Sequence, residues 1–135
     1  MDIQPRLHVQ RRCDVRKLCY SRAGRRSISI KPTGPGEDVT MTHDGYMRLA
    51  IEAARSVPRR PFGTVIVRPA RGEFVAVGAN RCDENPILHG EIDAINRCAA
   101  AHPGIDWSEL ALYTTAEPCA MCLSAIVWAG IPIVY

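Results

Sequence analysis

The apolar patterns of residues 41–135 predict an α/β fold, a layered sheet with helices on both faces. The first observation is their order along the chain. One helical pattern is followed by two β-branched runs, and then by a helix, a strand, a helix and a strand. The second observation is that metal-binding residue types stand where the last two helices are expected to begin. Open α/β sheets place their sites at such helix N-termini, beside the ends of strands.

The first helix is expected between Thr42 and Pro58. Thr42 or Asp44 can cap its start, and Pro58 ends it. Its apolar residues recur with helical spacing and form one face: Tyr46, Leu49, Ala50, Ala53, Ala54 and Val57.

Two strands and a second helix follow. Residues 63–68 (GTVIVR) and 74–79 (FVAVGA) are β-branched runs, and the connection PARGE between them predicts a hairpin. The second helix is expected to begin near His89 and to stop at the His-Pro-Gly sequence of residues 102–104. Its spacing predicts three buried residues: Ile92, Ile95 and Ala99.

The remaining elements are a strand, a helix and the start of a fourth strand: residues 110–114, 119–129 and 131–135. Gly130 is the C-terminal stop of this third helix. Pro118 is expected at its first helical position. Trp128 could face the site, but we expect a packed core aromatic.

Residues 1–40 are treated as a leader outside the domain formed by residues 41–135. The leader carries nine Lys/Arg and four Asp/Glu, net +5, whereas the domain carries eight and ten, net −2. Since the leader has neither helical nor strand periodicity, we expect disorder. A transit peptide, a structured nucleic-acid-binding arm and an over-extended start upstream of Met41 are the alternatives.

The six cysteines do not predict a disulfide framework. Cys119 and Cys122 form a metal-type pair, and Cys82 and Cys98 are expected as small apolar residues. No apolar run is long enough to span a membrane, and none follows the basic start as in a secretory signal. We expect a cytoplasmic protein, or an organellar one if residues 1–40 are a transit peptide.

His89 and Glu91 form an H-x-E sequence, and Cys119 and Cys122 belong to a P-C-x-x-C sequence whose first cysteine lies 30 residues after the histidine. A neutral imidazole and two thiolates are good zinc ligands, and zinc with three protein ligands keeps a fourth position for water. In the first turn of a helix both cysteines project to one side, and the helix N-terminus favours their thiolate forms. We expect one Zn²⁺ per chain, with a bound water or hydroxide.

Glu91 is expected to be the catalytic residue and not a ligand. It would take a proton from the attacking water and later return one to the departing amine. A lone C-x-x-C could also be a redox pair or half of a structural zinc site. A redox pair needs no H-x-E partner, and a site of four cysteines needs a second close pair, which Cys82 and Cys98 do not form.

This combination resembles the signature of the zinc-dependent nucleobase deaminases. Residues 43–135 resemble the cytidine and deoxycytidylate deaminase superfamily, and within it the branch of guanine deaminases, nucleoside deaminases and tRNA adenosine deaminases. The segments that carry the resemblance are PFGTVIV, GAN, NPILHGEIDAI and LYTTAEPCAMCLSAIVWAGI. The resemblance implies a three-layer α/β/α fold, Glu91 as the proton shuttle, and three zinc ligands: His89, Cys119 and Cys122.

Three further residues are candidates for substrate contacts. The resemblance implies that Asn80, at the end of the second strand, contacts the base, while a simple turn residue is the alternative. Phe62 stands where the family lines its pocket, and core packing is equally plausible. The carbonyl of Pro118 could accept a hydrogen bond from the departing amine.

The resemblance implies a hydrolytic deaminase of purine metabolism that releases ammonia and forms a homodimer. We expect guanine or guanosine as the substrate, and the alternative is adenosine in tRNA, the substrate of a tRNA-specific adenosine deaminase. The domain's net −2 disfavours tRNA, which calls for a basic footprint, although the basic leader weakens this objection. From a different class, the chain could be a catalytically impaired zinc-binding or interaction module.

The relatives that the chain resembles continue beyond the fourth strand, so the fold is expected to be incomplete at its C-terminus. The fourth strand would then be an unprotected edge bearing four apolar side chains: Ile131, Ile133, Val134 and Tyr135. Such an edge predicts self-association or poor solubility, together with slow turnover.

Overall fold

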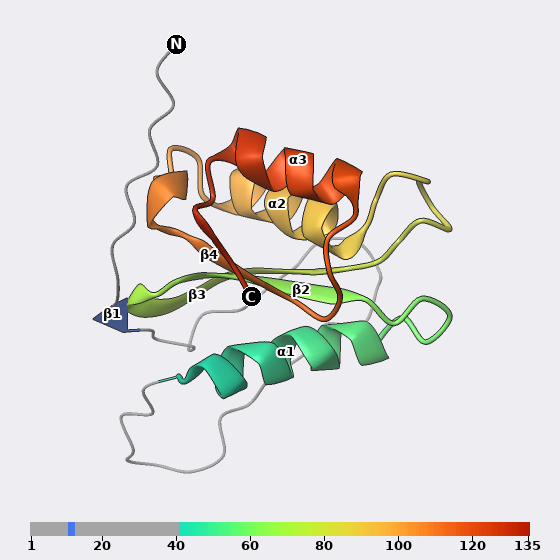
Figure 1. Ribbon diagram of the computed structural model, residues 1–135, viewed down its shortest axis with the longest axis horizontal. Helices are drawn as coiled ribbons and strands as arrows, with labels where there is room; N and C mark the ends of the chain where they lie inside the picture. Colours follow the sequence, from blue (N-terminus) through green and yellow to red (C-terminus); the bar gives the residue numbers. More distant parts are fainter. Residues whose placement is uncertain (1–10, 13–40) are drawn as a thin grey trace.

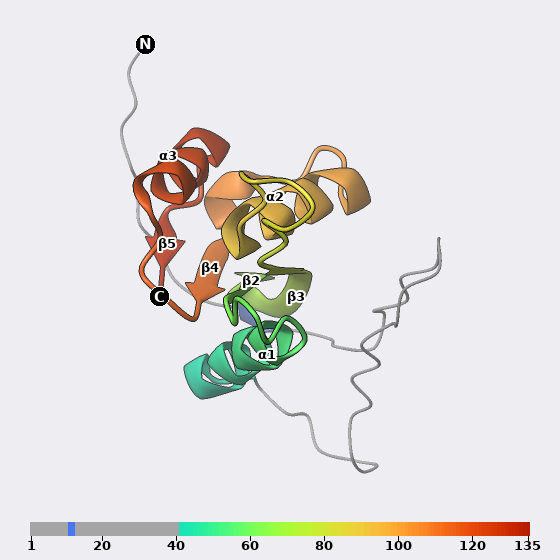
Figure 2. The same ribbon diagram turned by 90° about the vertical axis from the view of Figure 1, so that its right-hand side faces the viewer.

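The computed structural model describes residues 11–12 and 41–135 and arranges them in three layers (Figure 1). Helix α1 (His43–Arg55) covers one face of a five-stranded sheet. Helices α2 (Gly90–Ala101) and α3 (Ala120–Ala129) lie side by side over the other face, as the perpendicular view confirms (Figure 2). The predicted three-layer α/β/α architecture is therefore confirmed.

The sheet has the order β1-β3-β2-β4-β5. The hairpin pair β2–β3 and the pair β2–β4 are antiparallel, whereas β1–β3 and β4–β5 are parallel. The strands are β1 (Arg11–Arg12), β2 (Gly63–Arg68), β3 (Ala70–Ala79), β4 (Ala111–Thr114) and β5 (Ile133–Val134).

Strand β3 begins four residues earlier than the sequence predicts, although the predicted hairpin is confirmed. The turn closes where the N–H of Gly72 donates to the carbonyl of Pro69, 3.0 Å away, and Gly72 has the positive φ of 56° that favours glycine. Ala70 and Gly72 belong to the strand because they pair with β1. No sequence pattern indicated β1. Its pairing with β3 makes two leader residues part of the sheet. The expectations of disorder, a transit peptide or a binding arm concern the rest of the leader, residues 1–10 and 13–40, which lie outside the described residues.

Helix α1 begins and ends close to its predicted bounds. Thr42 is its N-cap and accepts a hydrogen bond from the N–H of Gly45, 3.3 Å away. The helix ends at Arg55, ahead of Pro58. On the predicted apolar face the following residues are buried against the sheet: Tyr46, Ala50, Ala53 and Ala54.

Helix α2 buries a different face from the predicted one. Ile95 is half-buried and packs against the core, Ile92 is half-buried and Ala99 is exposed, so the prediction is wrong for Ala99 and only partly met by the two isoleucines. The reason lies in Gly78 of β3, where a Cβ would stand 2.2 Å from the carbonyl oxygen of Gly90. Since α2 packs backbone against backbone here, the positions that meet Gly78 are the small residues Gly90 and Ala94. The buried positions are Gly90, Glu91, Asp93, Ala94 and Cys98.

The outer face of α3 carries apolar side chains that the described residues leave uncovered. Trp128 is 89% exposed, so its expected core packing is wrong. Cys122 and Ile126 occupy the inward side, and Trp128 lies about half a turn away from Ile126. The other exposed apolar residues of this helix are Leu123 and Val127.

Strand β5 lies at the edge of the sheet, as expected, but not all of the apolar side chains predicted to be exposed there are exposed. Val134 and Tyr135 are exposed, whereas Ile131 is buried in the core between the sheet and helices α2 and α3. The expectation of an exposed Ile131 is therefore wrong. A short 3₁₀ helix, η1 (Trp107–Glu109), precedes β4 and was also not predicted.

Candidate metal centre and active site

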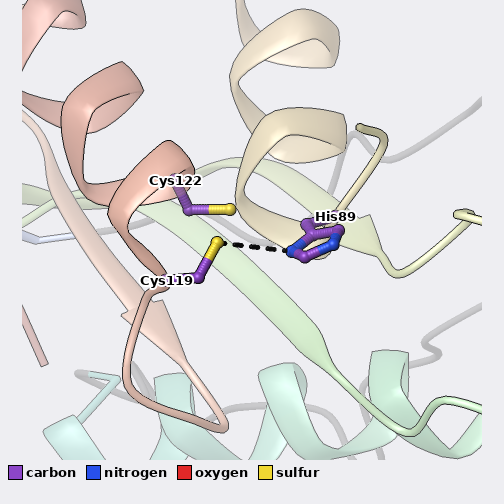
Figure 3. A group of neighbouring side chains, drawn as sticks. All are labelled: His89, Cys119 and Cys122. Carbon is purple, nitrogen blue, oxygen red and sulfur yellow. Dashed lines mark hydrogen bonds between the residues drawn. The ribbon is translucent and has the colours of Figure 1, made fainter. Parts of the chain in front are cut away.

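Two of the proposed zinc ligands are the N-cap residues of the helices on the same face of the sheet. His89 precedes α2 and Cys119 precedes α3, and both have extended backbone (φ −72° and −65°, both with ψ 166°). An N-cap side chain commonly accepts a hydrogen bond from the first turn of its helix. The side chain of His89 accepts none, and the side chains of both His89 and Cys119 point into the space between the two helix starts (Figure 3).

The three predicted ligands converge. The Nδ1 atom of His89 lies 3.7 Å from Sγ of Cys119, and Cys122 completes a group whose ligand atoms all lie within 4.8 Å of one another (Figure 3). Within residues 11–12 and 41–135 this is the group of His, Cys, Asp and Glu side chains that could hold a metal ion. Pro118 is not at the first helical position as expected, because Cys119 is the N-cap and Pro118 precedes it.

The donor set fits zinc. The Zn–N and Zn–S bond lengths of tetrahedral sites place neighbouring ligand atoms about 3.5 to 3.8 Å apart, which the His89–Cys119 separation already matches. One imidazole and two thiols also match the ligand preferences of this ion. A zinc ion could therefore bind with little rearrangement of the two helix starts.

The two cysteines differ in their affinity for a proton. The backbone N–H of Cys122 donates to the sulfur of Cys119 and lowers the pKa of the Cys119 thiol, as expected for a helix N-terminus. Burial raises the pKa of the Cys122 thiol far above its usual range, and the neighbouring carboxylate of Glu91 raises it further. The expectation that both thiolates are favoured before metal binds is therefore wrong for Cys122.

Glu91 is buried in the first turn of α2, close to Cys122 but outside the three converging ligands. Its Oε1 atom accepts a hydrogen bond of 3.0 Å from the hydroxyl of Thr114. That hydroxyl in turn accepts one of 3.3 Å from the hydroxyl of Thr64. The sequence reasoning missed both threonines. The alternation along the strand LALYT could have indicated Thr114, because it places that residue on the same face as Leu112.

Asn80, which follows β3, lies next to Phe62, which precedes β2. The N–H of Asn80 donates to the carbonyl of Phe62 over 2.9 Å, and Oδ1 of Asn80 accepts from the N–H of Cys82 over 3.0 Å. Asn80 therefore forms the side-chain turn that was its alternative interpretation. The Phe62 side chain is 44% exposed, which does not fit core packing. The carbonyl of Phe62 also approaches Gly90, beside His89.

The described cysteines are free thiols, as expected. Cys98 is buried, whereas Cys82 is only partly buried. None of the described helices is long and apolar enough to cross a membrane.

Residues 40–135 match the family model described as the cytidine and deoxycytidylate deaminase zinc-binding region. The chain belongs to this family. Its convergent histidine and two cysteines form a possible metal site within the matched zinc-binding region.

Among curated relatives in this family, guanine deaminase of Bacillus subtilis is 35% identical over 66% of the chain. A tRNA-specific adenosine deaminase of Streptococcus pyogenes is 43% identical over 64% of the chain. The chain spans 60% of the length of the first relative and 57% of the second.

Solved structures of deaminases share the fold. The crystal structure of Bacillus subtilis guanine deaminase superposes with a TM-score of 0.64 at 33% identity, covering 70% of this chain and 62% of that one. A structure from work on A-to-I editing by tRNA:A34 deaminases superposes with a TM-score of 0.59 at 34% identity, covering 68% of this chain and 73% of that one.

Proposed function

We propose that this chain catalyses zinc-dependent hydrolytic deamination of a purine base or nucleoside, with guanine or guanosine preferred. The observation that carries the proposal is the buried carboxylate of Glu91 beside three ligand atoms that lie within 4.8 Å of one another. A metal site with three protein ligands and an adjacent unligated carboxylate is the arrangement that hydrolytic deamination requires.

His89, Cys119 and Cys122 would hold one zinc ion per chain. When bound, the ion supplies a Lewis acid that makes water acidic enough to attack at neutral pH. Cys122 contributes as a thiolate, so its proton must leave when the metal binds.

Glu91 moves the protons of the reaction. Its carboxylate accepts one from the attacking water and delivers it to a ring nitrogen of the base. The water oxygen forms a bond to the amine-bearing carbon, Glu91 then transfers the second proton to the exocyclic amine, and the C–N bond breaks. The products are a base with C=O in place of C–NH₂ and one molecule of ammonia, so one water is consumed in each turnover.

The chemistry of Phe62 and Asn80 favours a planar substrate. Phe62 has a half-exposed ring and a backbone carbonyl near the start of α2, and an aromatic face can stack on a purine. Asn80 is positioned by its turn and carries an amide that can hydrogen-bond a base edge. The carbonyl of Pro118, next to the ligand Cys119, would accept from the departing amine. The similarity to Bacillus guanine deaminase supports guanine as the base.

Deamination of adenosine in tRNA is the second candidate, since the Streptococcus relative is a tRNA-specific adenosine deaminase and shares 43% identity. The net −2 of residues 41–135 weighs against it, because tRNA binding depends on basic groups and falls steeply with salt. Filter binding to tRNA at two salt concentrations separates the two candidates. Tight, salt-sensitive binding supports the tRNA substrate.

Metal analysis and ammonia release together test the proposal. The full chain is loaded with zinc and assayed on guanine, guanosine, adenine, adenosine, cytosine, cytidine and a tRNA. We expect about one zinc per chain and ammonia from the guanine compounds. Ammonia only from tRNA would favour the second candidate, and bound zinc without ammonia from any compound would indicate a non-catalytic zinc-binding module. Light scattering on the same sample tests the expected homodimer, and fractionation of cells tests the expected cytoplasmic location.

A further inference from the structure

A chain of two hydroxyls ties Glu91 to the centre of the sheet. Thr114 of β4 donates to Oε1 of Glu91 over 3.0 Å, and Thr64 of β2 donates to Thr114 over 3.3 Å. The two threonines are directly opposite each other in the antiparallel pair β2–β4, the arrangement in which cross-strand hydroxyls meet. Strands β2 and β4 and helix α2 are thus linked through one continuous chain of hydrogen bonds.

The direction of these hydrogen bonds follows from their chemistry. An ionised carboxylate has no proton to give, so the single proton of the Thr114 hydroxyl must point at Glu91. The oxygen of Thr114 is then an acceptor, and Thr64 supplies its proton to it. Each hydroxyl is therefore held in one orientation by the next group in the chain.

Burial keeps water out of this chain of hydrogen bonds. Thr64, Thr114 and Glu91 are 0%, 7% and 6% exposed, so solvent has little access to replace a lost hydroxyl. The fit is also close. A Cβ on Gly90 would lie 3.1 Å from the hydroxyl oxygen of Thr64, so the glycine before Glu91 lets the helix start approach the threonine pair.

We propose that Thr114, oriented by Thr64, is a positioning residue that assigns different tasks to the two oxygens of Glu91. Oε1 is anchored to the sheet. The Cys122 thiol also hydrogen-bonds to Glu91, but it gives up its proton when it binds the metal, and Oε2 then carries the proton between water and substrate. This inference rests on the proposed function, because it concerns the carboxylate that moves the protons. A carboxylate anchored at one oxygen cannot swing away from the reacting atoms, and small misplacements of catalytic groups reduce rates strongly.

The test compares Thr114→Val, which removes the hydroxyl and keeps the shape, with Thr114→Ser, which keeps the hydroxyl and removes a methyl group. In zinc-loaded full chain, Thr114→Val is expected to lower kcat about 10- to 100-fold, the loss that corresponds to one hydrogen bond to a charged group. KM and zinc content should stay within about twofold of wild type, because Thr114 is not a metal ligand. Thr114→Ser should recover most of kcat.

Crystal structures of the two variants give a readout that is independent of turnover. We expect Oε1 of Glu91 to remain within hydrogen-bond distance of residue 114 in Thr114→Ser and to move in Thr114→Val. Thr64→Val removes only the outer hydroxyl and should lower kcat by a few-fold. If Thr114→Val does not fold, Thr114→Ala provides a smaller hydroxyl-free side chain for the same measurements.

The inference fails if a folded, zinc-loaded Thr114→Val retains wild-type kcat, or if its Glu91 carboxylate does not move. It also fails if Thr114→Ser is as impaired as Thr114→Val, since packing rather than the hydroxyl would then matter. Absence of ammonia from the wild type on every substrate would instead overturn the proposed function. The position of Glu91 in the two crystal structures would still decide the role of Thr114.

Discussion

The carboxylate of Asp93 holds the end of strand β3 against the start of helix α2. Its Oδ2 accepts a hydrogen bond of 3.2 Å from the backbone N–H of Ala79, the residue before Asn80. The same oxygen lies 2.9 Å from Nε of Arg97, and Arg81 lies 3.9 Å from the other oxygen. This carboxylate therefore connects the strand end that carries Asn80 with the helix that carries Glu91.

Replacement of Asp93 should destabilise the fold and disturb the site together. Asp93→Ala is expected to lower the free energy of unfolding by about 2 to 4 kcal/mol, since a nearly buried acceptor is removed and its donors lose their partner. Asp93→Asn, the matched control, keeps the shape and one acceptor and should lose about half as much. Urea unfolding of both variants measures the difference. Equal losses for the two would contradict the role of the charge.

Gly78 should tolerate no side chain. A Cβ at this position would lie 2.2 Å from the carbonyl oxygen of Gly90 and 2.3 Å from the nitrogen of Ala94, so α2 must move outward in Gly78→Ala. We expect a loss of more than about 2 kcal/mol and weaker zinc binding, because α2 follows directly on His89. Gly45→Ala, in the first turn of α1, meets only the flexible end of Met41 and should be neutral or slightly stabilising. Thermal melts and metal titrations report both effects.

Replacement of Glu91 and replacement of the cysteines should affect zinc binding differently. Glu91→Ala is expected to keep about one zinc per chain and to lower kcat by about 10²- to 10⁴-fold, because the side chain moves protons and binds no metal. Cys119→Ser and Cys122→Ser should lose the metal and part of the stability, since metal binding contributes to the free energy of folding. Zinc analysis with denaturation curves checks this, and a Glu91→Ala protein without zinc would show that its assigned role is wrong.

Stability should fall in alkaline solution, partly through Cys98. Burial raises the pKa of its thiol from the ordinary 9.0 to about 11 in the folded protein. Above about pH 9 the unfolded chain loses this proton while the folded chain retains it, so the free energy of unfolding decreases up to about pH 11 and is unaffected below pH 9. Burial raises the pKa of Tyr113 as well, which acts in the same direction. Unfolding curves at pH 8 and pH 10.5 should show a smaller decrease for Cys98→Ala than for wild type.

Removal of residues 1–40 should leave the domain folded. A chain that begins at Met41 retains every proposed ligand, and the β1 pairing it loses involves only the first residues of β3, at the end away from Asn80. We expect a shift in melting temperature below about 4 °C and unchanged zinc content. A larger loss of stability would show that the leader packs against the domain.

The sequence predicted most of the fold because local patterns determine it. Helix α1 has one apolar face and a capping threonine, and the two strands of the hairpin are β-branched runs. The buried face of α2 was mispredicted because its contact with the sheet depends on Gly78, a residue distant in sequence. Strand β1 is a two-residue pairing with β3, too short to leave a strand periodicity in the sequence.

The convergence of the three proposed metal ligands was predictable because their chemistry and spacing are specific, whereas the groups around them were not predictable. His89, Cys119 and Cys122 converge as expected. The hydroxyl chain to Glu91 and the carboxylate of Asp93 depend on which strand lies beside which, and threonine or aspartate alone indicates no partner. The burial that raises the pKa of Cys122 likewise depends on tertiary packing.

Strand β4 serves both faces of the sheet with only four residues. Ala111 and Tyr113 pack toward α1, while Leu112 packs on the opposite side, where Thr114 reaches Glu91. A single inserted or deleted residue in this strand would exchange the two sets. The tyrosine ring would enter the layer of α2 and α3, and the hydroxyl would enter the core beneath α1. The length of β4 itself is therefore constrained, whereas a change in chain length in the loop around Gly104, before the strand, would leave its two faces unchanged.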